Sequence, residues 1–218
     1  MGLAQQLIET IHRGGIVMYP MIALAFLVFF LIVERWLYLR SAYNRSEEFA
    51  KRFFPLLQKG KLDEAKALIP EYKCPIARMV AAGMENMELS KEDMRGVLHE
   101  VALADIPKLE RFLNVIAVIG TMMPILGLLG TVTGMIATFD VITVKGTGDP
   151  RALAGGISQA LITTEAGLVF ALPIILLHSV LSARVDRLLA EMERAQTAFL
   201  NLYRGVGADG GKRIQDVS

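Results

Sequence analysis

Two mostly apolar stretches of the sequence contain polar side chains, five of which have chemical types and positions that suit proton transfer. The stretches are residues 115–142 and 153–180, and the five side chains are those of Thr131, Gln159, Thr163, Thr164 and Glu165. Ionisable groups inside a membrane-spanning helix are rare, costly and usually functional. Neither stretch contains a Lys or Arg that could pair with Glu165, so its carboxyl must be neutral or hydrated. We therefore predict a proton or ion pathway through these residues.

The hydroxyls of Thr131 and Thr164 are expected to lie at the same depth in the membrane. A membrane span needs about 20 mostly apolar residues, so both stretches can cross a bilayer in opposite directions. Thr131 lies about ten residues from the end of the first stretch and Thr164 about ten from the start of the second, which puts both roughly 15 Å deep. The angle between successive residues of a helix, however, separates the polar groups: Gln159 and Thr163 lie on one side of Thr164, whereas Glu165 lies on its other side. Glu165 is therefore expected to face a neighbouring subunit or the first of the two stretches.

The threonines also have a simpler interpretation. A threonine in a membrane helix often donates its hydroxyl to a carbonyl of its own helix. Thr131 and Thr164 would then be ordinary packing residues, and the sequence leaves both interpretations open.

Small residues and prolines in the same stretches predict how the helices pack and bend. Gly130 and Gly134 form a small-xxx-small pair, which allows membrane helices to approach closely. The mid-span prolines, Pro124 and Pro173, are expected to produce kinks. The glycines assigned to helix packing are Gly127, Gly130, Gly134 and Gly167.

A third apolar stretch, residues 16–33, completes a set of three predicted spans. Arg13 is the only Lys or Arg before it and no small-x-small cleavage site follows, so we interpret it as an uncleaved anchor. Lys and Arg gather after this stretch and after the last one, which predicts that these regions are cytoplasmic. The predicted order is a periplasmic interfacial helix (1–15), a span (16–38), a cytoplasmic helical region (39–111), a span (112–142), a periplasmic loop (143–152), a span (153–183) and a cytoplasmic helix with a flexible tail (184–218).

The predicted fold class is an all-α membrane protein with long helices that extend into the cytoplasm. Breaks at Gly60 and before Pro75 predict helices over 47–59, 62–69 and 75 to about 87. Ser90 with Asp93 three residues later resembles a capping box, and opens a helix expected to run through Pro107 into the second span. Apolar residues at helical spacing extend the last span over 180–202, and the glycine-rich residues 205–218 are expected to be disordered.

Composition narrows the function classes. The net charge of +1 gives no basic field for nucleic acid. Cys74 is the single cysteine, so it cannot form an intrachain disulfide, and no metal-ligand spacing is present. No nucleophile–base pair or phosphate-binding loop is visible, so we expect neither an enzyme nor a bound cofactor.

Two segments of the last two predicted spans are IGTMMPILGLLGTVTGMIATF, residues 119–139, and GGISQALITTEAGLVFALPIILLH, residues 155–178. Both resemble the MotA/TolQ/ExbB proton-channel family. The stretch IVERWLYLR, residues 32–40, looks like the end of that family's first span. Three spans and the size of the first cytoplasmic loop look like the ExbB and TolQ members rather than the four-span flagellar MotA. The resemblance is strong in the last two spans and weak in the cytoplasmic insert.

The resemblance implies a homopentamer in the inner membrane of a Gram-negative cell. Its lumen would hold the transmembrane helices of an ExbD- or TolR-like partner, which bring a proton-carrying aspartate. Proton-motive force would then drive motion that a TonB- or TolA-like protein passes on. The family's pore threonines fall on Thr131 and Thr164. Its glutamate early in the last span is Gln159 here, while Glu165 takes a position that is usually small and apolar.

The resemblance thus implies a proton-channel subunit that energises a TonB-like protein for outer-membrane transport. A TolQ-like subunit for envelope maintenance, or a gliding or secretion motor, is the alternative within the family. A passive oligomeric membrane scaffold with no partner in its pore is the alternative from a different class.

Overall fold

The computed structural model describes residues 3–145 and 150–208, and every regular element in these ranges is a helix. This confirms the all-α prediction. The chain falls into two compact units, Met1–Arg35 with Phe112–Leu181 (unit 1), and Trp36–Arg111 with Ser182–Ser218 (unit 2). Three stretches are long and apolar enough to cross a membrane, Met18–Gln58, Lys91–Val144 and Ala154–Tyr203.

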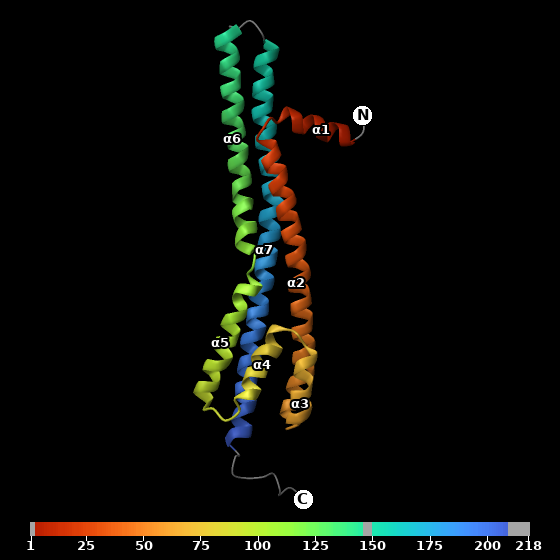
Figure 1. The fold of residues 1–218 in the computed structure, drawn as a ribbon, viewed down its shortest axis with the longest axis vertical. Helices are drawn as coiled ribbons and strands as arrows, with labels where there is room; N and C mark the ends of the chain where they lie inside the picture. The colour runs from red at the N-terminus through yellow and green to blue at the C-terminus, as the bar shows by residue number, and fades with distance from the viewer. Residues whose placement is uncertain (1–2, 146–149, 209–218) are drawn as a thin grey trace, which may run out of the picture. The chain divides into compact units, whose positions relative to one another are not determined.

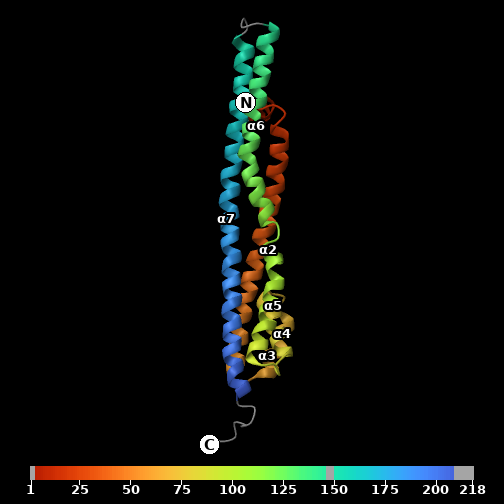
Figure 2. The ribbon, with the colours of Figure 1, turned by 90° about the vertical axis from the view of Figure 1, so that its left-hand side faces the viewer.

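Unit 1 contains the apolar parts of the three long helices. Helix α1 (Leu3–Arg13) lies within residues 1–15, where a short helix is predicted, and Gly15, with φ of 75°, separates it from α2 (Met18–Gln58). Helix α6 (Leu113–Lys145) and the first part of α7 (Pro150–Ala208) lie side by side, whereas α1 points away from them (Figures 1 and 2). Side chains from all three long helices form the core, among them Met21, Val28, Ile116, Met123, Ala171 and Ile174.

Unit 2 is a helical cluster around the second part of α7. The second part of α2 is followed by α3 (Leu62–Leu68), a 3-10 turn η1 (Ile69–Glu71), α4 (Pro75–Glu85) and α5 (Lys91–Leu109). Gly60, with φ of 71°, makes the predicted break after α2. The predicted apolar stripe on α7 is buried in this cluster, at Val185, Leu188, Met192, Ala195 and Phe199.

The start of α5 confirms the predicted cap, but its end corrects a prediction. The Ser90 hydroxyl accepts a hydrogen bond from the Asp93 amide at 3.2 Å. The helix runs through Pro107, as expected, but ends at Leu109 instead of continuing into the second span. Phe112 adopts a φ of 65°, and this left-handed residue terminates the helix before α6 begins at Leu113.

Both mid-span prolines lie inside unbroken helices. Pro124 is within α6 and Pro173 within α7, so neither ends its helix. Helix α7 includes Gly205–Ala208, the start of the tail predicted to be disordered. The rest of that tail, residues 209–218, lies outside the described residues, as do residues 146–149 of the predicted periplasmic loop.

Candidate functional site

The contact between α6 and α7 is built on glycines at places where the two backbones nearly touch. A Cβ atom added to Gly127 would lie 3.1 Å from the Cα of Thr164. A Cβ atom added to Gly167 would lie 2.7 Å from the Met123 carbonyl oxygen. Because backbone atoms cannot move aside as a side chain can, only glycine fits these two positions without shifting a helix.

The other two glycines singled out in the sequence lie in the same contact. A Cβ atom at Gly130 would overlap the Thr163 side chain, and one at Gly134 would lie 2.9 Å from the carbonyl oxygen of Gly156. All four glycines therefore occupy positions that suit the packing role predicted for them.

The two candidate pore threonines lie within one helical turn of each other along this contact. The Thr164 hydroxyl donates to the Gly127 carbonyl of α6 at 3.1 Å, and Ala160 offers an alternative acceptor at the same distance. Thr131 follows Gly127 by one turn, and its hydroxyl donates to the Leu128 carbonyl at 2.6 Å. Both threonines are half-exposed in the chain. The contact between Gly127 and Thr164 therefore agrees with the expectation that Thr131 and Thr164 lie at the same depth.

Thr131 and Thr164 also lie on the same side of the helix pair. Gly130 meets Thr163, whereas Gly127 meets Thr164. Thr131 shares the helical stripe of Gly127, four residues away, and so belongs to the Thr164 side. Each hydroxyl uses its one hydrogen on a carbonyl, but its oxygen can still accept a hydrogen bond from water or from an acid.

Thr163 and Gln159 pack against another segment of the same chain. Thr163 is fully buried, and its hydroxyl donates to the Gly14 carbonyl at 2.7 Å and to the Gln159 carbonyl at 2.8 Å. The Gln159 amide packs so closely on Gly15 that a Cβ atom there would overlap it. Both side chains therefore face the segment between α1 and α2. This is a packing contact on the side away from Thr164, and the pathway role of Thr163 and Gln159 stays a prediction.

Glu165 points away from α6. The residue is exposed, between the exposed apolar side chains of Leu161 and Leu172. The hydroxyls of Thr131 and Thr133 donate to carbonyls of their own helix, Thr133 to that of Gly130 at 3.1 Å. Within one chain Glu165 therefore does not face the preceding span, and the other alternative, a contact with a neighbouring subunit, stays a prediction. Its carboxyl lies in an apolar stripe that the chain itself does not cover.

Unit 2 holds a buried carboxylate that the sequence did not reveal. Asp105 is 2 % exposed, and its Oδ2 accepts hydrogen bonds from Nε and Nη2 of Arg78 at 3.0 and 2.8 Å. Its Oδ1 accepts from Nζ of Lys108 at 2.9 Å. The i,i+3 spacing could have suggested Lys108 as a partner, but nothing in the sequence pairs Arg78 with a residue on the next helix. Among the described residues, no group of three or more His, Cys, Asp or Glu could hold a metal ion.

Three apolar helical stretches with polar groups inside them define a multi-pass membrane protein. Residues 71–194 match the MotA/TolQ/ExbB proton channel family, and the chain belongs to this family. Membership confirms the resemblance seen in the sequence and the expectation that the protein is not an enzyme.

Relatives in three organisms bear ExbB-like or TolQ names. The chain is 28% identical over 180 residues to an ExbB homologue of Methanothermobacter thermautotrophicus, covering 82% of this chain and 64% of that protein. It is 31% identical over 183 residues to an ExbB-like biopolymer transport protein of Synechocystis, covering 81% and 70%. It is 26% identical over 185 residues to the Tol-Pal system protein TolQ of Pseudomonas aeruginosa, covering 80% of each chain. At these identities the ExbB and TolQ roles are not separated.

Proposed function

We propose that this chain is the channel subunit of an ExbB–ExbD-type motor, which uses proton-motive force to energise a TonB-like protein. The observation that carries the proposal is the pair Thr131 and Thr164, at one level and on one side of a glycine-packed helix pair. In a ring of copies, this side of each α6–α7 pair would face the lumen. Ten hydroxyl oxygens from five copies would then be available to accept hydrogen bonds from water or from the aspartate of a partner helix.

The assembly we propose is a homopentamer with an ExbD- or TolR-like partner in its pore. Within one chain only 28–33% of each apolar window is buried, so most of the apolar surface needs lipid or other protein to cover it. Unit 1 carries polar groups that lipid cannot satisfy, which favours burial of that surface between copies. Glu165 would then lie at the contact between neighbouring copies.

The proposed location is the inner membrane, with the N-terminus in the periplasm and unit 2 in the cytoplasm. The distribution of Lys and Arg supports this orientation. Relatives also occur in an archaeon and a cyanobacterium. The proposal of a Gram-negative inner membrane is therefore supported by the family resemblance and not by the source of these relatives.

A TolQ-like subunit for envelope maintenance is the second candidate, and the similarity to a TolQ protein favours it. A passive scaffold without a partner is the third. These candidates make different predictions about what the chain binds.

The test is co-expression with the genes adjacent to its own, followed by affinity purification in mild detergent and native mass spectrometry. We expect five copies of this chain with a partner whose single span carries an aspartate. Recovery of a TonB-like or a TolA-like protein would distinguish the first two candidates. A monomer, or a ring that never retains a partner, would contradict the proposal.

A further inference from the structure

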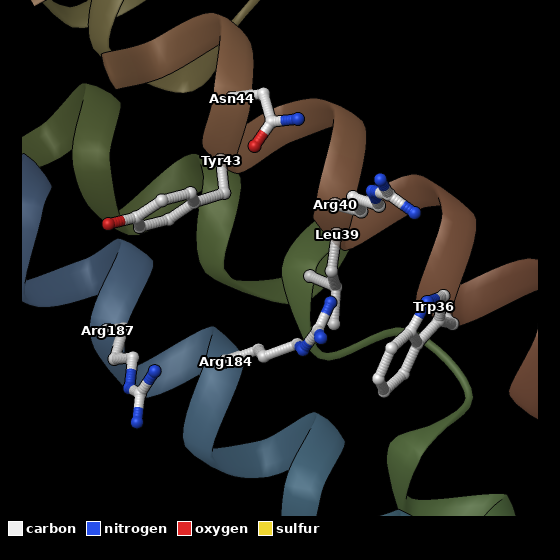
Figure 3. A pocket seen from close by; sticks show the side chains of 7 residues that line it. All are labelled: Trp36, Leu39, Arg40, Tyr43, Asn44, Arg184 and Arg187. Atoms are coloured by element: carbon white, nitrogen blue, oxygen red, sulfur yellow. The ribbon is translucent and has the colours of Figure 1, made fainter.

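Unit 2 contains a basic cavity that the proposed channel function does not use. Its volume is about 320 Å³, and it lies between the second parts of α2 and α7 (Figure 3). The side chains that line it are Trp36, Leu39, Arg40, Tyr43, Asn44, Arg184 and Arg187.

The cavity carries three guanidinium groups and no acidic lining residue. In the part of the chain that the structure describes, Arg40, Arg184 and Arg187 form no ion pair, whereas Arg52 pairs with Glu48 and Arg194 pairs with Glu191 in the same unit. Arg184 reaches from α7 to α2, where its guanidinium carbon lies 3.5 Å from the centre of the Trp36 ring (Figure 3). This cation–π contact holds one positive charge at the cavity wall without neutralising it.

The position of these residues along the helices fits the headgroup layer of a membrane. The apolar part of α2 ends at Val33, so Trp36 and Arg40 lie about 5 and 10 Å beyond it along the helix. The headgroup layer on each side of the hydrocarbon core is about 5–8 Å thick, so Trp36 lies within it and Arg40 lies just beyond it, close enough for a long arginine side chain to reach the phosphates. Tryptophan and tyrosine concentrate at this level, where one end of the ring is apolar and the other is hydrated.

We propose that this cavity binds the phosphodiester of an anionic phospholipid. Arginine binds phosphate oxygens through two parallel hydrogen bonds, and basic pockets between membrane helices suit anionic headgroups. Arg40 and Arg187 contact the phosphate, Arg184 is held against Trp36 beside it, and Trp36 and Tyr43 contact the glycerol and upper acyl region. A free phosphate ion offers the same oxygens, so the experiment must distinguish binding of a lipid phosphate from binding of free phosphate.

The experiment is native mass spectrometry of the detergent-purified assembly, titrated with phosphatidylglycerol, with phosphatidylcholine or with inorganic phosphate. The variant is Arg40→Gln with Arg187→Gln, which leaves the contact between Arg184 and Trp36 in place. The control is Arg45→Gln, which removes an exposed charge from the same helix outside the cavity. The thermal midpoint of each variant checks that it is folded.

We expect phosphatidylglycerol to bind in preference to phosphatidylcholine. Each arginine near an anionic headgroup contributes about fivefold to binding, so the double variant should lose about 25-fold in affinity for phosphatidylglycerol, and the control less than twofold. Equal binding of the two lipids, or equal losses in the double variant and the control, would overturn the proposal. If millimolar inorganic phosphate displaced phosphatidylglycerol, the cavity would be a site for free phosphate, which would overturn the proposal that it binds a lipid.

Discussion

Thr131 and Thr164 are the residues on which the channel interpretation depends. Each donates to a backbone carbonyl, which is what a packing threonine does, and each also leaves an oxygen on the half-exposed side of the helix pair. The two roles differ in what removal of the hydroxyl does, because packing depends on side-chain volume whereas water and acids interact with the oxygen.

The first prediction therefore concerns Thr131→Val and Thr164→Val. Each substitution keeps the volume and removes the hydroxyl, so the oligomer should persist while proton-coupled activity falls about tenfold, the value of one hydrogen bond of about 1.4 kcal/mol. Activity is measured as complementation of a deletion strain, with oligomer size as the check on assembly. Near-normal activity in both variants would identify them as packing residues.

The second prediction tests the glycine contact. Gly167→Ala places a Cβ atom against the Met123 carbonyl and the Gly127 backbone, so the helices must separate. We expect a loss of about 1–3 kcal/mol, typical of overpacking. Gly155→Ala is the matched control, since nothing lies within 4 Å of a Cβ atom there. Thermal unfolding in detergent measures both, and equal midpoints for the two variants would contradict the close packing.

At the scale of elements, one hydroxyl ties the end of α7 to the turn between α4 and α5. The Tyr203 hydroxyl lies 2.6 Å from the Met87 carbonyl and 2.7 Å from the Leu89 carbonyl, and shares its hydrogen between them. Phe199, one turn earlier, packs on Gly83 of α4. These contacts fix the second part of α7 within unit 2.

Tyr203→Phe should accordingly destabilise unit 2. It leaves two part-buried carbonyls without this donor, at a cost of about 1–2 kcal/mol. Faster amide hydrogen exchange around residues 87–89 should accompany the loss. Tyr43→Phe serves as control, because that exposed hydroxyl makes no hydrogen bond within the described residues. A Tyr203→Phe protein as stable as the control would show that packing alone holds the helix end.

Cys74 provides a pH-dependent test of the same unit. It is the N-cap residue of α4 and is buried, and burial raises the pKa of its thiol. A raised folded-state pKa gives stability that is present below the unfolded value, about 8.5, and is lost as pH rises above it. The thermal midpoint should therefore fall more steeply between pH 8 and 10 in the wild type than in Cys74→Ala. Parallel pH profiles would contradict the burial of this thiol.

The sequence predicted those elements whose signals are local. The short helix before the first span, the Ser90 cap and the buried stripe of α7 all depend on neighbours within one or two turns. The end of α5 was missed because a left-handed phenylalanine has no sequence signature. The pairing of Arg78 with Asp105 joins residues on two helices, and the packing of Thr163 on Gly14 joins residues 149 positions apart. Such contacts depend on the tertiary fold, so helical phase could separate Thr163 from Thr164 without showing what either side faces.

At the scale of the whole molecule, a single chain leaves apolar and polar surface in its membrane helices that it does not itself cover. Its apolar helices are mostly uncovered, a carboxyl lies in an apolar stripe, and its candidate pore residues Thr131 and Thr164 are half-exposed rather than enclosed. All three features are explained if copies of the chain surround a partner that carries the proton-exchanging group. Conduction should then belong to the complex and not to this chain alone.

Proton flux into liposomes tests most directly whether conduction requires the complex. The chain is reconstituted alone, or with the aspartate-bearing partner recovered by co-purification, and internal pH is followed after a membrane potential is imposed. The account predicts flux above the lipid background only when both are present, and its loss when the partner's aspartate is replaced by asparagine. Equal flux from the chain alone, or no flux from the intact complex, would contradict it.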